Sequence, residues 1–335
     1  MKRALPATEP LTVAILLPDN APPSMLASLP KSETSLNIVP VLTDAIPTGQ
    51  VIKAVVWAAP APAARLAAFL DAHPEVEWLH SLSAGVDGIA NIITGRLCDA
   101  PVLISNGRGA FSSSLGEYAI AAMLYFNKQF RKCEANRGAK LWDRFTMNVL
   151  EGKTLGFVGY GDIAKTTAAM AKPFGMKHIA LRRNPGKSAE ATAVPLAATY
   201  GPGAADDFYA QCDFVLCSLP LTAESKASIN ARSFGAMKES CVFISLGRGA
   251  VIDEAALHDA LTSGKIAGAA CDVFATEPLP KESPLWDCDN LLLTAHNADL
   301  TADYFGLAIQ TWRENLERYR KGEPLATPVD KSGGY

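Results

Sequence analysis

Three side chains in the second half of the chain have the types needed for anion binding and proton transfer. They are Arg248, Glu277 and His296, and each follows an apolar run that is typical of a β-strand. In an open α/β sheet, ligands bind beyond the carboxyl ends of the strands. An arginine, a glutamate and a histidine placed at that edge can therefore converge on one small substrate.

Each of these residues also has an ordinary explanation when it is considered alone. A single histidine after a strand is usually a polar loop residue, and Glu277-Pro278 could simply end a strand. Arg248 between Gly247 and Gly249 could be the cation of a turn. Only their order relative to other motifs can favour a shared site.

A glycine-rich stretch predicts a dinucleotide site. Gly159-x-Gly161-x-x-Ala164 lies between an expected strand, 154–158, and an expected helix, 162–174. In such a loop the first glycine makes the tight turn, the second lets a pyrophosphate approach the backbone, and the helix N-terminus offers unpaired N–H groups. A turn with only a packing role would look the same, but the strand before it and the helix after it favour a nucleotide. The predicted contacts are Gly159, Tyr160, Gly161, Asp162 and Ile163.

The residues after the next expected strand, 178–181, indicate which nucleotide is bound. An NAD site would place Asp or Glu about 20 residues beyond the glycines, where the carboxylate binds the ribose 2′-hydroxyl. Arg182 and Arg183 stand there instead. A guanidinium pairs with a 2′-phosphate, which a carboxylate would repel. We therefore predict that NADP(H) is preferred over NAD(H), the structural alternative being a solvated arginine pair at a strand end.

The elements that must position these residues form two series. In the first, short apolar runs alternate with helix-length segments, which is the βαβ rhythm of a parallel sheet. Its expected strands are 13–17, 37–41, 54–57, 78–82 and 102–105, and its expected helices are 21–29 and 62–72. Residues 112–137 then carry apolar residues at helical spacing and predict one long helix.

The second series starts at Lys153. Its expected strands are 154–158, 178–181, 214–219, 241–246, 267–271 and 291–294, and its expected helices are 162–174, 232–237, 253–263 and 301–321. The two series together predict an α/β fold with two Rossmann-like, doubly wound parallel-sheet domains and a cleft between them.

Composition excludes several classes of protein. The chain has 335 residues, 49% of them hydrophobic, and a net charge of −3, so neither disorder nor a nucleic-acid partner is expected. No apolar run approaches the roughly 20 residues that span a bilayer. Seven cysteines form no CxxC pair and no cluster at metal spacing, which favours reduced thiols and no metal site. No secretory segment is recognised in the first residues, so a cytoplasmic location is predicted.

The other histidines and three aromatic residues receive weaker assignments. His80 is expected to be structural or to line a cleft. His73, His178 and His258 carry no motif and are expected at the surface. Trp142, Trp286 and Tyr118 are expected to line a cleft or a seam between domains, or to pack in the core.

The motifs also occur in the order of a known family. The chain resembles the D-isomer-specific 2-hydroxyacid dehydrogenases, the family of phosphoglycerate dehydrogenase and glyoxylate/hydroxypyruvate reductase, over nearly its whole length. Ten motifs or residues match the family in the same order along the chain, and together they identify it more specifically than any one motif does. In chain order they are 83–87, 106–117, Trp142, the loop at Gly159, 218–222, 237–238, 246–249, 272–274, Glu277-Pro278 and His296.

The resemblance implies a role for each charged residue of the first paragraph. Arg248 would hold the 2-keto acid through its planar fork of donors. His296 would give a proton to the carbonyl oxygen in reduction and take it back in oxidation. Glu277 would pair with His296 and favour its protonated form.

The resemblance also implies the remaining contacts. Asp272 matches the position that binds the nicotinamide carboxamide. The loop of Ser83, Ala84 and Gly85 matches the one whose backbone N–H groups face the substrate carboxylate. Further cofactor contacts implied are Leu219, Pro220, Leu246, Gly247, Asp272 and His296.

Four positions depart from or discriminate within the family pattern. Ala295 stands where many relatives have proline before the histidine, which leaves that turn less rigid. Gly247 stands where alanine is usual, and the change is expected to be mild. Ser218 stands where some relatives have histidine. Glu277 argues against formate as the substrate, since the formate dehydrogenase branch has glutamine there.

Taken together, the resemblance implies a substrate domain of 1–108 with 299–335 and a dinucleotide-binding domain of 109–298. The implied reaction is NADPH-dependent reduction of a small 2-keto acid, of the glyoxylate or hydroxypyruvate type, to the D-2-hydroxy acid. The helix at 112–137 and its flanks resemble the family's dimerisation arm, so a homodimer is expected. The alternative is a nucleotide-sensing protein like the family's corepressors, with little turnover.

Overall fold

A computed structural model describes residues 10–186 and 194–334 of the chain. The chain divides into two compact units, Met1–Phe111 with Ala302–Tyr335, and Ser112–Thr301. The chain passes from the first unit to the second after residue 111 and returns after residue 301. Each of these points lies three residues beyond the expected domain boundary, at 108 and 298 respectively. The roles predicted for the two domains remain predictions. The expected absence of a secretory segment rests mostly on residues 1–9, which lie outside the described residues.

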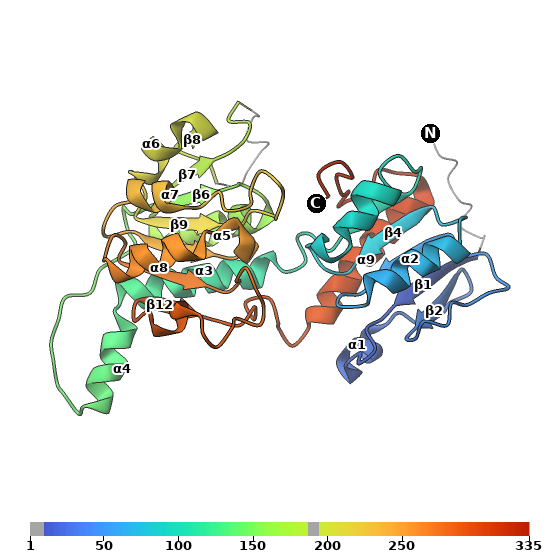
Figure 1. Cartoon of the computed structure of the whole chain (residues 1–335), viewed down its shortest axis with the longest axis horizontal. Helices are drawn as coiled ribbons and strands as arrows, with labels where there is room; N and C mark the ends of the chain where they lie inside the picture. Colours follow the sequence, from blue (N-terminus) through green and yellow to red (C-terminus); the bar gives the residue numbers. More distant parts are fainter. Residues whose placement is uncertain (1–9, 187–193, 335) are drawn as a thin grey trace. The chain divides into compact units, whose positions relative to one another are not determined.

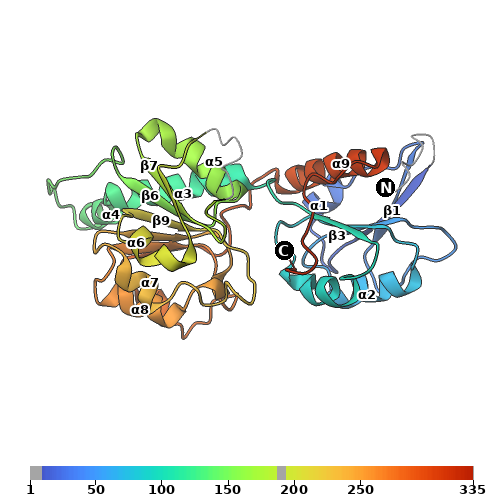
Figure 2. The same cartoon turned by 90° about the horizontal axis from the view of Figure 1, so that it is seen from above.

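The first unit is built on a parallel sheet of five strands in the order β2-β1-β3-β4-β5. The strands are β1 (Leu11–Leu16), β2 (Leu36–Val41), β3 (Ala54–Trp57), β4 (Trp78–Ser81) and β5 (Leu103–Asn106). The helices are α1 (Pro23–Ser28), α2 (Ala63–Ala72) and α9 (Tyr304–Lys321). Figure 2 shows α9 and α2 on opposite faces of this sheet.

Burial explains why these strands read as continuous apolar runs. β3 is buried along its whole length and β1 almost so, because helices cover both faces of a parallel sheet. The strand β2, by contrast, contains Pro40 and is half-exposed. It lies at the edge of the sheet, where a proline removes no ladder hydrogen bond.

The second unit carries a parallel sheet of seven strands in the order β12-β11-β10-β9-β6-β7-β8. The strands are β6 (Thr154–Val158), β7 (Lys177–Leu181), β8 (Ala198–Tyr200), β9 (Phe214–Cys217), β10 (Val242–Ser245), β11 (Gly268–Cys271) and β12 (Leu291–Leu293). The helices are α3 (Ser112–Asn127), α4 (Phe130–Gly138), α5 (Asp162–Ala171), α6 (Ala205–Tyr209), α7 (Ala231–Ala236) and α8 (Glu254–Thr262). The order reverses between β6 and β9, which is where open α/β sheets bind their ligands.

Helices cover both faces of this second sheet. Figures 1 and 2 show α3 and α5 on one face and α6, α7 and α8 on the other. Each unit thus has a doubly wound parallel sheet, and the predicted fold class is confirmed.

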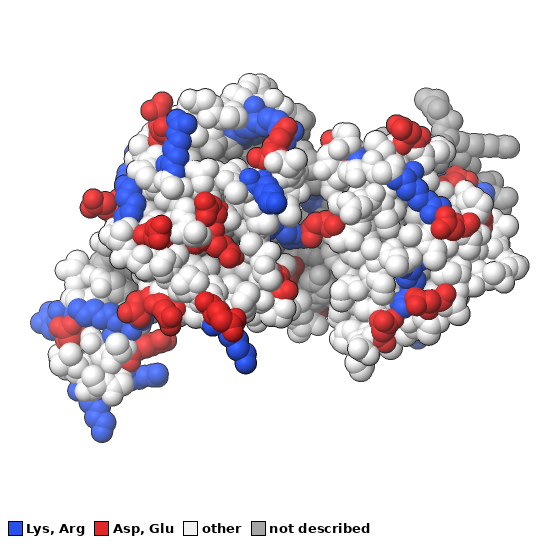
Figure 3. Space-filling view, viewed as in Figure 1, with Lys and Arg blue, Asp and Glu red and all other residues white. Residues whose placement is uncertain are grey.

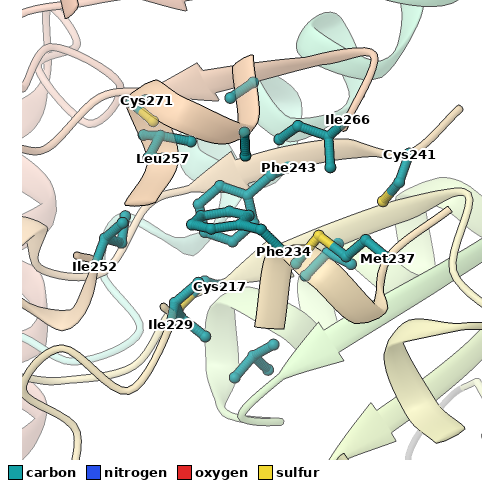
Figure 4. Packing of buried hydrophobic residues seen from close by; sticks show 14 of the residues in the cluster. Cys217, Ile229, Phe234, Met237, Cys241, Phe243, Ile252, Leu257, Ile266 and Cys271 are labelled. Carbon is teal, nitrogen blue, oxygen red and sulfur yellow. The ribbon is translucent and has the colours of Figure 1, made fainter. Parts of the chain in front are cut away.

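The core beneath α7 and α8 is aromatic and rich in sulfur, as Figure 4 shows. The rings of Phe234 and Phe243 meet edge to face, with centroids 5.5 Å apart. Burial raises the pKa of the Cys217 thiol to about 11 and that of Cys241 to about 12. These thiols therefore behave as small apolar groups. All seven cysteines are free, and only Cys98 and Cys133 are not buried.

The single helix predicted over 112–137 is wrong, because the structure has two helices there. α3 ends at Asn127 and α4 begins at Phe130. Between them Gln129 adopts a left-handed conformation with φ of 51°, which ends a right-handed helix. The apolar face that buries α3 does not continue, and α4 contains no buried residue.

Several weaker assignments also need correction. His73 and His178 are buried, not at the surface. Trp142, by contrast, is 93% exposed and does not pack in the core. The short elements β8 and α6 were not predicted. His80 is fully buried and bonded to Ser105, as expected of a structural histidine.

The surface of the molecule carries charges of both signs. Acidic and basic side chains are interspersed over the face drawn in Figure 3. Within residues 10–186 and 194–334, no helix combines the length and apolarity needed to cross a membrane.

Candidate active site

The register of the second sheet places the predicted site residues at one edge. Val158 pairs with Leu181 and with Cys217, Cys217 with Ser245, Ser245 with Cys271, and Cys271 with Leu293. The residues that follow these strand ends are Gly159, Arg182, Ser218, Leu246, Asp272 and Thr294. Three segments therefore lie at the same edge of the sheet. They are the glycine loop at Gly159, the loop of Gly247, Arg248 and Gly249 (the arginine loop), and the turn that carries His296 (the histidine turn).

The glycine loop has the geometry that its sequence predicts. Gly159 has φ of +81°, and its N–H donates to the carbonyl of Leu181 at 3.0 Å. Gly161 is the N-cap of α5, and no side chain caps that end. A Cβ built on Gly161 would meet no heavy atom within 4 Å. The second glycine is therefore not required by packing, and it leaves open space in front of a helix N-terminus.

The other predicted contacts of the glycine loop differ in how far their side chains are buried. The Tyr160 side chain is buried and packs edge to face on Phe157, with centroids 5.4 Å apart. Only its backbone thus faces the loop. Asp162 and Ile163 form the first turn of α5 and are half-buried.

The two arginines after β7 are not equivalent. Arg182 follows the strand next to β6, and its N–H donates to the carbonyl of Tyr200 at 2.9 Å. The Arg183 guanidinium forms an ion pair with Glu224 at 2.7 Å, and both side chains are exposed. Arg182 directly follows the strand, at the position where the ribose-binding residue is expected, and it stays the predicted contact of a 2′-phosphate.

The arginine loop is packed tightly against two other loops. A Cβ on Gly247 would lie 2.3 Å from the Leu219 carbonyl oxygen, and one on Gly249 would lie 1.9 Å from the Phe274 carbonyl carbon. Neither backbone neighbour can move cheaply, so both positions demand glycine. The expectation that glycine at 247 is a mild change is wrong: this residue lets the loop at Leu219 approach the arginine loop.

Glu277 and His296 form a direct pair. Nδ1 of His296 lies 2.7 Å from Oε2 of Glu277, and Oε1 of the same carboxylate accepts the Phe274 N–H at 2.9 Å. Because Phe274 also packs on Gly249, the loops of Arg248 and Glu277 are in contact. A carboxylate on Nδ1 orients the imidazole and leaves Nε2 for a substrate.

Arg248 lies within electrostatic reach of the same group of side chains. Its Nη1 donates to the Gly247 carbonyl at 3.0 Å. Burial raises the pKa of Asp299, while the charges of His296 and Arg248 act to lower it. One carboxyl is thus near both side chains. Together with the His296–Glu277 pair and the contact between the loops of Arg248 and Glu277, this brings the three predicted residues to one region of the second unit.

The turn that carries His296 is anchored by Asp272. Oδ1 of this buried carboxylate accepts from Oγ1 of Thr294 at 2.6 Å and from the Asn297 N–H at 2.9 Å. Oδ2 accepts the Ala298 N–H at 3.1 Å. The side chain that the resemblance assigns to the carboxamide is therefore also an anchor of the histidine turn.

In the first unit, the loop of Ser83, Ala84 and Gly85 has the carbonyl groups of Ser83 and Ala84 engaged in hydrogen bonds. Oγ of Ser81 and the Gly107 N–H each donate to the Ser83 carbonyl at 3.1 Å, and Nδ2 of Asn106 donates to the Ala84 carbonyl at 2.7 Å. Within the described part of the chain, the N–H groups of Ala84 and Gly85 have no acceptor. Such a loop offers donors to an anion.

One cavity of the second unit lies away from this edge. It has a volume of about 550 Å³ and is lined by strand beginnings, Phe214, Val242 and Leu291, and by residues of α3 and α4. No residue of the candidate site lines it. The chemistry is therefore not housed in this cavity.

Sequence reasoning missed Asp299 and Thr294, and it assigned Tyr118 only to a cleft, a seam or the core. Oγ1 of Thr294 lies 2.8 Å from the Tyr118 hydroxyl, which comes from α3. Asp299 stands three residues after His296, and this short spacing could have indicated a carboxylate close to the histidine. The contact of Tyr118 with Thr294 joins residues 176 positions apart, and no local pattern indicates it.

The second unit has a glycine loop at the topological switch of a seven-stranded parallel sheet, and its Arg, Glu and His group lies at the same edge. These features define a dinucleotide-binding α/β protein. The family model for the NAD binding domain of D-isomer specific 2-hydroxyacid dehydrogenases matches residues 120–298. The chain belongs to this family of oxidoreductases.

The relatives of this chain include several reductases and dehydrogenases. It is 28% identical to glyoxylate reductase of Korarchaeum cryptofilum over 316 residues, 91% of this chain and 86% of the relative. It is 32% identical to D-3-phosphoglycerate dehydrogenase of Methanocaldococcus jannaschii over 246 residues, but that match is 72% of this chain and only 45% of the relative.

Among solved structures, the chain is similar to an NADPH-dependent glyoxylate/hydroxypyruvate reductase of Sinorhizobium meliloti in complex with NADP and sulfate. The TM-score is 0.80 at 26% identity, covering 98% of this chain and 100% of that one.

Proposed function

We propose that this protein is an NADPH-dependent reductase of small 2-keto acids, of the glyoxylate or hydroxypyruvate type, and that it forms the D-2-hydroxy acid. The observation that carries the proposal is the pair of His296 and Glu277 at 2.7 Å, with the loop of Glu277 in contact with the loop of Arg248. An oriented imidazole next to a guanidinium can protonate a carbonyl oxygen and bind the anion that carries it.

The residues at the sheet edge fit a bound dinucleotide. The open space at Gly161 and the uncapped N-terminus of α5 would accept the pyrophosphate, since helix N-termini bind anions. Leu219, Pro220, Leu246 and Gly247 would line the same site, and Asp272 has acceptor capacity for an amide. The reduced nicotinamide would supply a hydride to the keto carbon.

In this proposal the chain's own residues bind the acid and move the proton. Arg248 pairs with the substrate carboxylate and polarises the carbonyl. Nε2 of His296 donates its proton to the carbonyl oxygen, and Glu277 steadies the ring. The free N–H groups of Ala84 and Gly85, together with Ser83, bind the carboxylate from the first unit.

We propose NADP(H) as the preferred nucleotide and NAD(H) as the weaker one. Arg182 follows β7, where an NAD-specific protein would place a carboxylate, and the S. meliloti relative was solved with NADP. Arg182→Asp should lower the ratio of kcat/KM for NADPH to that for NADH. Arg183→Asp makes the same charge change at a side chain that pairs with Glu224, and should lower the ratio less. An unchanged ratio in Arg182→Asp would remove it from the phosphate site.

The test of the activity is a turnover assay. NADPH oxidation is followed with glyoxylate, hydroxypyruvate, pyruvate and larger 2-keto acids, and nucleotide affinity is measured separately by titration. Turnover with a small 2-keto acid supports the proposal. Binding of nucleotide with negligible turnover across the panel would instead favour the nucleotide-sensing alternative.

We also propose a homodimer and a cytoplasmic location. Several large apolar side chains after α4 are exposed, namely Leu141, Trp142, Met147 and Val149. Contiguous exposed apolar surface commonly marks a protein interface. Light scattering should give twice the chain mass, and Trp142→Glu should shift the protein toward monomer. A wild-type monomer at micromolar concentration would contradict the dimer.

A further inference from the structure

We propose that Asp272, Thr294 and Tyr118 are positioning residues that hold the turn of His296 in its working conformation. This inference rests on the proposed function, because His296 acts as the proton donor there. The residues themselves come from three elements that are far apart in the sequence: Asp272 follows β11, Thr294 follows β12, and Tyr118 lies in α3.

The turn needs an anchor because of its backbone. His296 has φ of 54°, in the left-handed region. Only a few per cent of non-glycine residues adopt this region, although histidine does so more often than most. Such conformations persist only where the surroundings hold them, and they gather at functional sites. The imidazole can meet Glu277 only if this conformation is kept.

Asp272 supplies most of the anchor. Its side chain accepts hydrogen bonds from Thr294, Asn297 and Ala298, on both sides of the histidine. Its own carbonyl accepts the His296 N–H at 2.8 Å. A carboxylate has about four lone-pair positions. Three are filled within the turn, so one remains for a nicotinamide carboxamide.

The direction of the hydrogen bonds from α3 can be deduced. The Asp272 carboxylate can only accept, so Thr294 must donate its hydroxyl proton to it. Oγ1 of Thr294 then accepts from the Tyr118 hydroxyl at 2.8 Å. Burial raises the pKa of Tyr118 to about 12, so the phenol keeps its proton and remains the donor. The chain of donors runs from Tyr118 through Thr294 to Asp272.

A second contact ties the turn to the same helix. Oγ of Ser114 on α3 donates to the Ala298 carbonyl. The turn is therefore held to α3 at both ends, through Thr294 before the histidine and Ala298 after it. A helix that touches no reacting atom thus sets where the imidazole stands.

The experiment compares variants that keep shape and change hydrogen bonding. Thr294→Val keeps the volume of the side chain but breaks both side-chain bonds, and should lower kcat about 10- to 100-fold, as a small misplacement of a catalytic group does. Thr294→Ser keeps the hydroxyl and should be close to wild type. Tyr118→Phe loses one hydrogen bond and should lower kcat about 3- to 10-fold. Tyr125→Phe, on the same helix, is the matched control and should be silent.

Two further readouts separate positioning from other roles. The dissociation constant of NADPH should be unchanged in Thr294→Val and Tyr118→Phe. The ring resonances of His296, assigned by their loss in His296→Asn, should shift in Thr294→Val and not in Thr294→Ser. The spectra need no turnover, so they test the positioning even if no keto acid is reduced and the proposed function fails.

The inference is overturned by either of two results. One is a Thr294→Val protein with wild-type kcat and unmoved His296 resonances. The other is a loss confined to NADPH affinity, which would make these residues part of the cofactor site alone. If Thr294→Val does not fold, Tyr118→Phe and its control decide the question by the same measurements.

Discussion

The glycine loop and the histidine turn follow two strands of the same sheet and both require a left-handed residue, but they reach it differently. Gly159 has φ of +81° and His296 has φ of 54°. At Gly159 the conformation costs little, because glycine has no Cβ to clash. At His296 it opposes the intrinsic preference of the residue, and the hydrogen bonds to Asp272 maintain it.

The difference follows from what each loop offers a ligand. The glycine loop offers backbone N–H groups and open space, so any side chain would obstruct it. The histidine turn offers a side chain, so the residue at the bend cannot be glycine. A site that uses side chains must therefore recruit a second layer of residues, while one that uses the backbone needs only the right loop.

The largest expected effect concerns the histidine turn. His296→Asn removes the proton donor and should lower kcat about 10²- to 10⁴-fold, with nucleotide affinity close to normal, measured by steady-state kinetics and NADPH titration. His258→Asn, in a half-buried histidine of α8, is the matched control. Wild-type turnover in His296→Asn would show that the turn serves another purpose.

The next effect concerns the glycine loop. Gly159→Ala places a Cβ at a positive φ and 2.8 Å from Cδ2 of Leu219, and should lower the free energy of unfolding by about 1–2 kcal/mol. Gly161→Ala meets no heavy atom within 4 Å, so its stability should be unchanged while nucleotide affinity falls. Denaturant unfolding and NADPH titration check both. Equal nucleotide affinity in Gly161→Ala and wild type would place the pyrophosphate elsewhere.

The smallest effect concerns Asp299, the carboxyl beside the histidine turn. Burial raises its pKa despite the attraction of His296 and Arg248. The native state therefore binds the proton of Asp299 more tightly than the unfolded state does. The stability that this difference contributes is lost as pH rises through the raised pKa. Asp299→Asn should be more stable than wild type by about 0.5 kcal/mol at neutral pH, with the difference fading in acid. Thermal unfolding at pH 4 and pH 8 checks this, and a difference that grows in acid would contradict it.

Much of the fold could be predicted because local patterns set it. The strands at 54–57 and 154–158 have the predicted bounds, since apolar runs bounded by turn residues mark buried strands. The glycine loop was predicted because each glycine has its own local reason. The helix at 112–137 was predicted as one element because its break depends on the backbone of Gln129, a residue type that tolerates helix.

The charged residues of the candidate site could be predicted from the sequence, but the residues that hold them in place could not. Arg248, Glu277 and His296 were found from their strand ends and from the family order, and their roles remain proposals. The contacts of Tyr118 with Thr294, and of Gly247 with Leu219, depend on the register of strands far apart in sequence. No periodicity records such contacts, so they had to come from the structure.

The distribution of thiols has a practical consequence. Five of the seven cysteines are buried, and the two that are not, Cys98 and Cys133, fall one in each unit. A maleimide dye pair should therefore label these two positions without engineered cysteines. Energy transfer between them, recorded with and without NADPH, would follow the separation of the two units in solution.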